Sequence, residues 1–183
     1  MSSRRKAREL ALQLLFQTDL TRSTPQDILV IFWKVNETDS KNRKYAEFLF
    51  LKAFENQAHI DELIGGHAKH WRMDRMAVVD RNVLRMAVSE LLYGETPQVV
   101  VIDQAIEIAR KFSSDESSRF VNGVLDAVAR TMLEDKVANA GEAERVSVEA
   151  TDKDRFRFDP RIEGRWQEIW KSRGIFKAGR RPD

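Results

Sequence analysis

Residues 78–94, VVDRNVLRMAVSELLYG, carry the most regular apolar pattern of the chain. Five apolar residues recur there at the three- and four-residue spacing of one helix face: Val83, Leu84, Ala87, Val88 and Leu91. Gly94 follows the last of them and suits the C-terminal end of a helix. The stretch therefore predicts a central helix against which other helices pack.

Similar patterns occur on both sides of this stretch. Thr24 followed by Pro25 and Asp27 predicts one helix start, and Asp39 or Ser40 predicts another. A serine cap followed by two acidic residues opens SSDESSRFVNGVLDAVARTML, residues 113–133. No segment shows the sustained two-residue alternation of a half-buried strand. We therefore expect an all-α bundle of about six or seven helices that ends near residue 135.

The 183 residues suffice for one proper core and a short appendage. We expect a helical domain over 1–135, a charged linker over 136–155 and a basic, Trp-containing extension over 156–183. The chain has no cysteine, which excludes disulfides, thiolate metal sites and cysteine nucleophiles. Because no apolar run resembles a signal peptide or a membrane span, we expect a cytoplasmic protein.

Positive charge is concentrated at the N-terminus. Arg4, Arg5, Lys6 and Arg8 precede every acidic residue, whereas residues 9–135 carry 15 Lys/Arg against 20 Asp/Glu. A helix N-terminus is already the positive end of the helix dipole, so cations there cost a few tenths of a kcal/mol. A phosphate backbone would offset that cost. The alternative is a basic leader with no partner.

A second unusual stretch is SSRFVNGVLDAV, residues 117–128, where Asn122 and Gly123 interrupt a helical pattern. Phe120 lies one residue ahead of the apolar register. It suits a stacking platform for a base, with Arg119 on phosphate and Asn122 as a hydrogen-bonding amide. The alternative is that Phe120 packs in the core and Gly123 serves a contact between helices.

Four stretches in this order resemble the NusB family of bacterial transcription antitermination and ribosomal RNA synthesis factors. They are RRKARELALQLLFQ, VLRMAVSELLY, AIEIARKF and DESSRFVNGVLDAVA. The resemblance covers residues 3–133. It implies a seven-helix fold that binds boxA RNA together with ribosomal protein NusE, as part of an RNA polymerase elongation complex with other Nus factors. A homodimer is a further assembly that the sequence leaves open.

The resemblance also assigns residues. In the family the RNA surface combines the arginine-rich first helix with the start of the last helix. The matching positions here are Arg4, Arg5, Arg8, Gln13, Phe16, Glu116, Arg119, Phe120 and Asn122. Phe16 departs from the tyrosine common in the family, which removes a hydroxyl and keeps a ring for stacking. For the protein partner the matching positions are Asp80, Arg81 and Arg85, whose alternative is an ordinary solvated helix face.

Catalysis, a metal and a cofactor are not expected. His67 and His70 have a spacing that can hold a metal, but no third ligand completes a site. No Gly-rich phosphate loop or nucleophile elbow is present. Two other functions remain: a helical protein-interaction or dimerisation module without RNA, and a stand-alone relative of the RNA-binding domain of ribosomal RNA cytosine methyltransferases.

The C-terminal extension lies outside this resemblance. FDPRIEGRWQEIWKSRGIFKA, residues 158–178, resembles the first helix of leucyl- and valyl-type aminoacyl-tRNA synthetases. We expect an accessory helix anchored by Trp166 and Trp170, with its basic residues as an alternative extension of the RNA surface.

Overall fold

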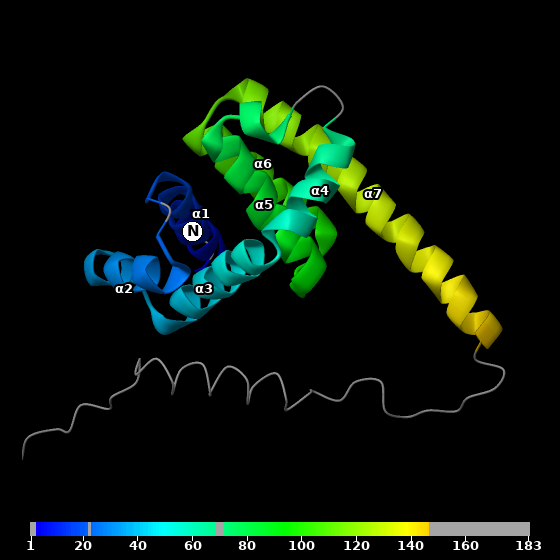
Figure 1. Cartoon of the computed structure of the whole chain (residues 1–183), viewed down its shortest axis with the longest axis horizontal. Coiled ribbons are helices and arrows are strands. Elements are labelled where there is room, and N and C mark those ends of the chain that lie inside the picture. Colours follow the sequence, from blue (N-terminus) through cyan, green and yellow to red (C-terminus); the bar gives the residue numbers. More distant parts are fainter. Residues whose placement is uncertain (1–2, 22, 69–71, 147–183) are drawn as a thin grey trace, which may run out of the picture. The chain divides into compact units, whose positions relative to one another are not determined.

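The computed structural model describes residues 3–21, 23–68 and 72–146, with side chains up to residue 134. These residues form seven α-helices and one short 3-10 helix, η1 (Figure 1). Their bounds are α1 Ser3–Thr21, α2 Pro25–Val35, α3 Ser40–Glu55, α4 Gln57–His67, η1 Met73–Arg75, α5 Val78–Tyr93, α6 Gln98–Phe112 and α7 Asp115–Val146. The described residues therefore confirm the predicted all-α bundle and its helix number.

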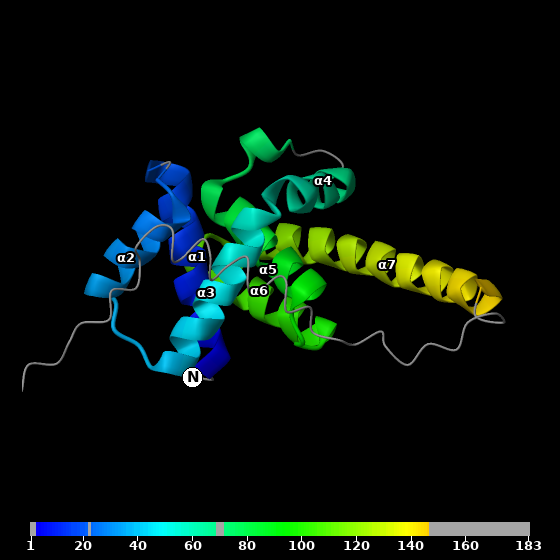
Figure 2. The ribbon, with the colours of Figure 1, turned by 60° about the horizontal axis from the view of Figure 1, so that its bottom comes forward.

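Helix α5 is the centre of the bundle, as its apolar pattern predicts. It contacts α1, α3, α4 and α6, which surround it in two views (Figures 1 and 2). Its predicted stripe is buried except for half-buried Leu91. Its polar side is also buried, including Asn82, Ser89 and Glu90, because neighbouring helices cover that side as well. The sequence pattern predicted only the apolar half of this burial.

The predicted helix starts are confirmed by capping hydrogen bonds. The Thr24 hydroxyl accepts from the Asp27 amide at 3.3 Å, and Pro25 opens α2. The Asp39 carboxylate accepts from two backbone amides at the start of α3. Ser114 accepts from the Ser117 amide at 3.1 Å just before α7. These local contacts satisfy amides that have no partner inside the helix.

Helix α7 is longer than the sequence predicts. Its first half contributes Val121, Leu125 and Val128 to the core. It then continues to Val146, through the first part of the stretch predicted as a linker over 136–155. Ala, Glu and Lys in this part have high helix propensity, so the helix persists without an apolar stripe. The predicted extension over 156–183, with Trp166 and Trp170, lies outside the described residues. No helix in the described ranges is both long and apolar enough to cross a membrane.

Gly94 ends α5 for a steric reason. Its φ of −92° is ordinary for any residue, so a left-handed conformation is not what requires glycine. A Cβ added there would lie 2.6 Å from the Glu90 carbonyl oxygen and 3.1 Å from Glu90 Cγ. The glycine therefore permits the chain to turn closely over Glu90.

Gly94→Ala should lower the free energy of unfolding by about 1–3 kcal/mol, because backbone must move to admit the methyl group. Urea titration followed by circular dichroism measures the change. Gly65→Ala is the matched control, since a Cβ at Gly65 in α4 meets nothing within 4 Å. It should be neutral or stabilise by up to about 1 kcal/mol. Equal effects at the two glycines would contradict the steric explanation.

Candidate nucleic-acid interface

Arg8 of the basic cluster is buried in the core. Its guanidinium donates to both carboxylate oxygens of Glu90, at 2.7 and 2.6 Å, and so ties α1 to α5. Arg8 is 2% exposed and Glu90 1%. The prediction that Arg8 contacts RNA directly therefore needs correction: its charge is neutralised inside the protein. The sequence could not distinguish it from Arg4, because the carboxylate that buries it lies 82 residues away.

A chain of hydrogen bonds runs from this pair to the surface. The Tyr45 hydroxyl donates to Glu90 at 2.6 Å and lies 3.0 Å from the Thr96 hydroxyl. Since the single Tyr45 proton points to Glu90, Thr96 donates to Tyr45 and accepts from Arg4 at 3.3 Å. The Arg4 guanidinium also lies over the Tyr45 ring, 5.3 Å from its centre. The contacts with Thr96 and with the Tyr45 ring thereby hold the exposed Arg4 side chain in place.

The pKa values within this cluster follow from the balance of burial and pairing. Burial alone raises the pKa of Glu90, but hydrogen bonds from Arg8 and Tyr45 and the Arg8 charge lower it below its ordinary value. Burial and the Glu90 carboxylate raise the pKa of Tyr45. For Arg8 the attraction of Glu90 outweighs burial and raises the pKa. Arg8 and Glu90 are therefore both charged at neutral pH.

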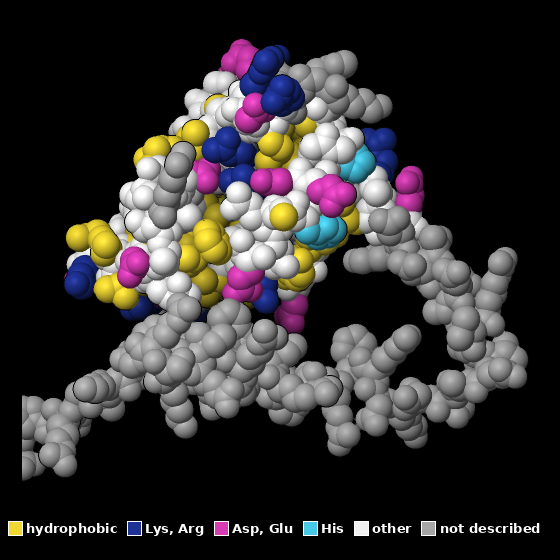
Figure 3. Space-filling model, in the orientation of Figure 1, with side chains coloured by type: hydrophobic (Ala, Val, Ile, Leu, Met, Phe, Trp, Pro, Cys, Tyr) yellow, Lys and Arg dark blue, Asp and Glu magenta, His cyan; other side chains and the backbone are white. Residues whose placement is uncertain are grey.

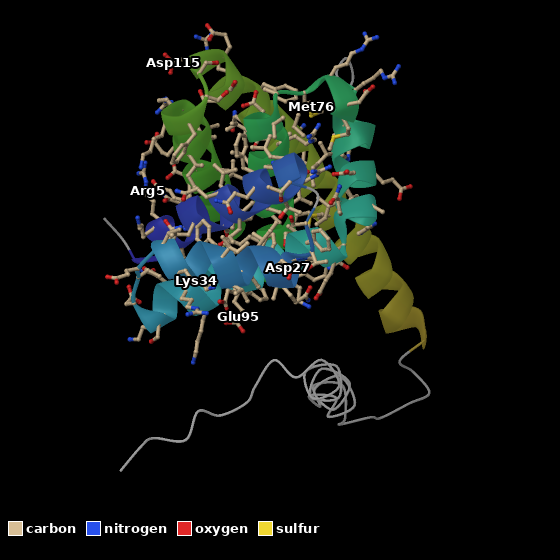
Figure 4. All side chains as sticks on the ribbon, turned by 60° about the vertical axis from the view of Figure 1, so that its left-hand side comes forward. Arg5, Asp27, Lys34, Met76, Glu95 and Asp115 are labelled. Carbon is tan, nitrogen blue, oxygen red and sulfur yellow. The ribbon has the colours of Figure 1, made fainter. Side chains whose placement is uncertain are left out.

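A ladder of ion pairs, here called the α6 ladder, joins the start of α1 to the start of α7. Arg5 lies 4.0 Å from Glu107, which pairs with Arg110 at 2.5 Å, and Arg110 lies 3.4 Å from Asp115. Figure 4 shows Arg5 and Asp115 on the same edge of the molecule, with α6 between them. The two stretches predicted to bind RNA are thus neighbours on one surface.

A second contact supports this arrangement. Lys111 near the end of α6 donates to both carboxylate oxygens of Glu9, at 2.9 and 2.8 Å. Glu9 also lies 3.6 Å from Arg5. Because Arg5 meets Glu107 and Glu9 meets Lys111, α1 runs in the same direction as α6. Gln13 and Phe16, further along α1, are half-buried.

The residues predicted on α7 differ in exposure. Glu116 and Arg119 are exposed, and Asn122 is half-buried. Phe120 is partly buried and packs against the core, which agrees with the structural alternative for this ring. A Cβ at Gly123 would meet nothing within 4 Å, so the described residues show no close helix contact that requires this glycine.

The three residues predicted to contact a protein partner are engaged inside the bundle. Arg85 donates to both carboxylate oxygens of Asp61 at 2.7 Å and is 6% exposed. Arg81 donates to Asp19 at 2.9 Å, and hydrogen bonds and charges from Arg81 and Arg85 outweigh burial and lower the Asp19 pKa. Asp80 is 8% exposed and accepts from Ser117 at 2.8 Å. Asp80 and Arg85 therefore do not form the ordinary solvated helix face that was the alternative, and the contact with a protein partner stays a prediction.

Four functional candidates were not predicted as site residues. Arg110 and Lys111 lie on the ladder surface, and Tyr45 and Thr96 hold Arg4. Arg110 and Lys111 lie near the end of AIEIARKF, and their positive charge could have identified them from the sequence. Nothing in the sequence identifies Tyr45 and Thr96, because their role depends on contacts between segments that are distant in sequence.

Within the described residues no group of three or more His, Cys, Asp or Glu side chains is placed to hold a metal ion. His67 Nε2 lies 3.2 Å from the Thr131 hydroxyl of α7, and His70 lies outside the described residues.

Comparison with known proteins relates the chain to one family. The model of the NusB family matches residues 5–130. Transcription antitermination protein NusB of Koribacter versatilis is 48% identical over 132 residues, covering 71% of this chain and 90% of that protein. A structure of T. maritima NusB has 38% identity and a TM-score of 0.64, covering 69% of this chain and 90% of that one.

A further similar structure is a crystal structure of antitermination factors NusB and NusE in complex with dsRNA. It has 28% identity and a TM-score of 0.65, and the match covers 72% of this chain and 98% of that chain.

The Arg8 and Glu90 pair can be tested by a double-mutant cycle. Glu90→Leu alone should cost about 3–5 kcal/mol of unfolding free energy, because it leaves the Arg8 charge buried without a partner. Arg8→Met combined with Glu90→Leu should cost less than either single change, since no unpaired charge remains. Urea unfolding of the four proteins gives the coupling energy. Additive single effects would contradict a tight pair.

The same pair predicts a response to acid. The folded-state pKa of Glu90 lies below its ordinary value of 4.5, so its stabilising effect is present above 4.5 and is lost as pH falls through the folded-state pKa. Between about pH 6 and about pH 3 the wild-type protein should lose more stability than Arg8→Met/Glu90→Leu. Asp19 keeps some acid dependence in both proteins. Parallel losses would show that the pair does not carry the effect.

Proposed function

The chain belongs to the NusB family, and we propose that it acts in transcription antitermination and ribosomal RNA synthesis, by binding boxA-type RNA together with ribosomal protein NusE. In this role it is part of an RNA polymerase elongation complex in the cytoplasm, where bacterial transcription takes place. The role is one of binding, without catalysis. The observation that carries the proposal is the α6 ladder, which joins the basic start of α1 to the start of α7.

The ion pairs of the α6 ladder are exposed enough for an RNA phosphate to replace a carboxylate as the partner of an arginine. The Arg110 side chain is 53% exposed and that of Asp115 71%. Such surface pairs contribute only about 0–1 kcal/mol each, so replacing a carboxylate by a phosphate costs little. Each phosphate contact releases counterions from the RNA and gains affinity at moderate salt. The Arg8 pair, with both side chains buried, does not offer this exchange.

The RNA-binding surface that we propose therefore contains exposed or half-exposed cations on three helices. They are Arg4, Arg5, Lys6, Arg110, Lys111 and Arg119. Among the described residues Lys6 and Arg119 have no ion pair, which leaves both available for phosphate. Arg8 is a positioning residue in this proposal, because it fixes the helix that carries Arg4 and Arg5.

Side chains for reading bases lie beside these cations. Phe16 and Phe120 are half-buried, and we propose that they stack on bases. Gln13, Glu116 and Asn122 supply hydrogen-bonding groups at the same surface. Single-stranded RNA can present its bases to such rings and amides, whereas the bases of a duplex are stacked inside.

For the NusE contact we propose an indirect role of the three predicted residues. Asp80, Arg81 and Arg85 connect α5 to α7, α1 and α4 through Ser117, Asp19 and Asp61. They set the relative positions of these helices, and the accessible side chains around them make the contact.

Removing the exposed arginines tests the RNA surface. Arg4→Ala combined with Arg110→Ala should weaken binding to a boxA-containing RNA at least about tenfold, because two phosphate contacts are lost. The slope of log affinity against log salt concentration should become shallower by about 0.7 per contact for single-stranded RNA. Fluorescence anisotropy of labelled RNA measures both, with and without NusE.

Arg43→Ala is the matched control. Arg43 is an exposed arginine with its own carboxylate partner, Glu47 at 2.9 Å, but it lies on α3 and outside the ladder. Its removal should leave affinity and salt slope unchanged. If Arg43→Ala and Arg4→Ala/Arg110→Ala weaken binding equally, RNA attraction is general and the proposed surface is wrong.

A further inference from the structure

Val99 at the start of α6 and Leu133 on α7 are large apolar side chains that the bundle does not bury. Val99 is 77% exposed and Leu133 50%. Hydrophobic side chains also gather over α2, at the left of the space-filling view, where charged side chains of both signs lie beside them (Figure 3). Mixed charges of this kind identify no partner chemistry. The surface at Val99 and Leu133 differs, because a pocket with an acidic side opens next to it.

The pocket has a volume of about 180 Å³ and lies between the end of α5, the turn into α6 and α7. This is far more than the roughly 15 Å³ that a single water needs, so the pocket can admit a side chain. Its walls divide by chemistry. Leu91, Met132 and Leu133 form an aliphatic part, and Glu95, Thr96 and Gln98 form a polar part. Such walls suit a ligand with an apolar stem and a polar head.

Glu95 gives the pocket its acidic side. It is exposed and lies at the lower edge of the bundle in Figure 4. Among the described residues no ion pair reaches Glu95, because Lys52, which lies over the adjacent Tyr93 ring, pairs with Glu55 at 3.7 Å instead. Asp103, further along α6, is a second exposed carboxylate without an ion pair in the described ranges. These carboxylates attract a cation and repel a phosphate backbone.

The polar wall also offers hydrogen-bond acceptors. The Thr96 hydroxyl donates to Tyr45 and accepts from Arg4, which leaves it one further acceptor position. A guanidinium carries five N–H donors in a planar fork that matches a carboxylate such as Glu95. The aliphatic stem of an arginine packs well along apolar walls, and arginine is enriched among the side chains that anchor protein interfaces.

We propose that this pocket binds an arginine side chain of a partner protein. The guanidinium pairs with Glu95, its stem packs against Leu91 and Met132, and apolar neighbours of the arginine pack on Val99 and Leu133. The pocket contains none of the cations proposed to bind RNA, so failure of either proposal leaves the other standing.

Three short peptides test the site on the full chain. They have the form acetyl-Leu-X-Leu-amide, where X is arginine, citrulline or glutamate, and citrulline keeps the shape of arginine without its charge. NMR titration of isotope-labelled protein should place the arginine peptide at the amides of Gly94, Glu95, Thr96 and Gln98, with a dissociation constant on the order of 1 mM. The citrulline peptide should bind at least about tenfold more weakly, and the glutamate peptide should not bind up to about 10 mM.

Variants assign the affinity to particular side chains. Glu95→Gln should weaken the arginine peptide about tenfold and leave the citrulline peptide unchanged, because only a charge is removed. Val99→Ser/Leu133→Ser should weaken both peptides equally. Glu62→Gln is the matched control, since Glu62 is an exposed glutamate on α4 and outside the pocket. Circular dichroism should show every variant folded.

Three results would overturn the proposal. The first is equal affinity for the arginine and citrulline peptides, or no binding of either up to about 10 mM. The second is a loss with Glu62→Gln as large as that with Glu95→Gln. The third is a boxA-containing RNA that shifts the amides of Glu95 and Gln98 and displaces the arginine peptide, because the pocket then belongs to the RNA surface.

Discussion

The buried ion pair between Arg8 and Glu90 is the contact on which the rest of this structure depends. It joins α1 to α5, the helix that touches most of the others. Removing two charges from water is costly, so the pair persists only because its geometry is bidentate and Tyr45 supplies a third hydrogen bond. The close turn at Gly94 lies directly over the same glutamate. A contact of this kind permits one position of α1 relative to α5.

The position of α1 in turn decides which cations are available for binding. Four basic residues lie within five positions, but Arg8 points into the core while Arg4 remains at the surface. Arg4 rests on Tyr45, which also contacts Glu90, so the buried and exposed arginines share one support. The α6 ladder begins at Arg5 on the same helix, and the side chains of its Arg110 and Asp115 are exposed. Burial therefore separates the charges with a structural role from those proposed to bind RNA. An exposed ion pair can change partners at little cost, whereas breaking a buried pair leaves an unpaired charge out of water.

Helix α2 illustrates a different use of the surface. Its inner side follows the rule for helices in bundles, with Ile28 and Phe32 in the core. Its outer side carries Val30 and Ile31 between Asp27 and Lys34, a pattern that the fold of a single chain does not need.

Local patterns in the sequence predicted much of this protein's secondary structure and its fold class. Apolar periodicity predicted the all-α fold and the central α5, and Thr24, Asp39 and Ser114 marked helix starts, since capping depends on residues within one turn. The resemblance to NusB supplied the family. Tertiary structure alone decided that Arg8, Asp80 and Arg85 are buried, because Glu90, Ser117 and Asp61 lie far from them in sequence. It also brought the start of α1 to the start of α7, a proximity that depends on packing between helices and leaves no local signal.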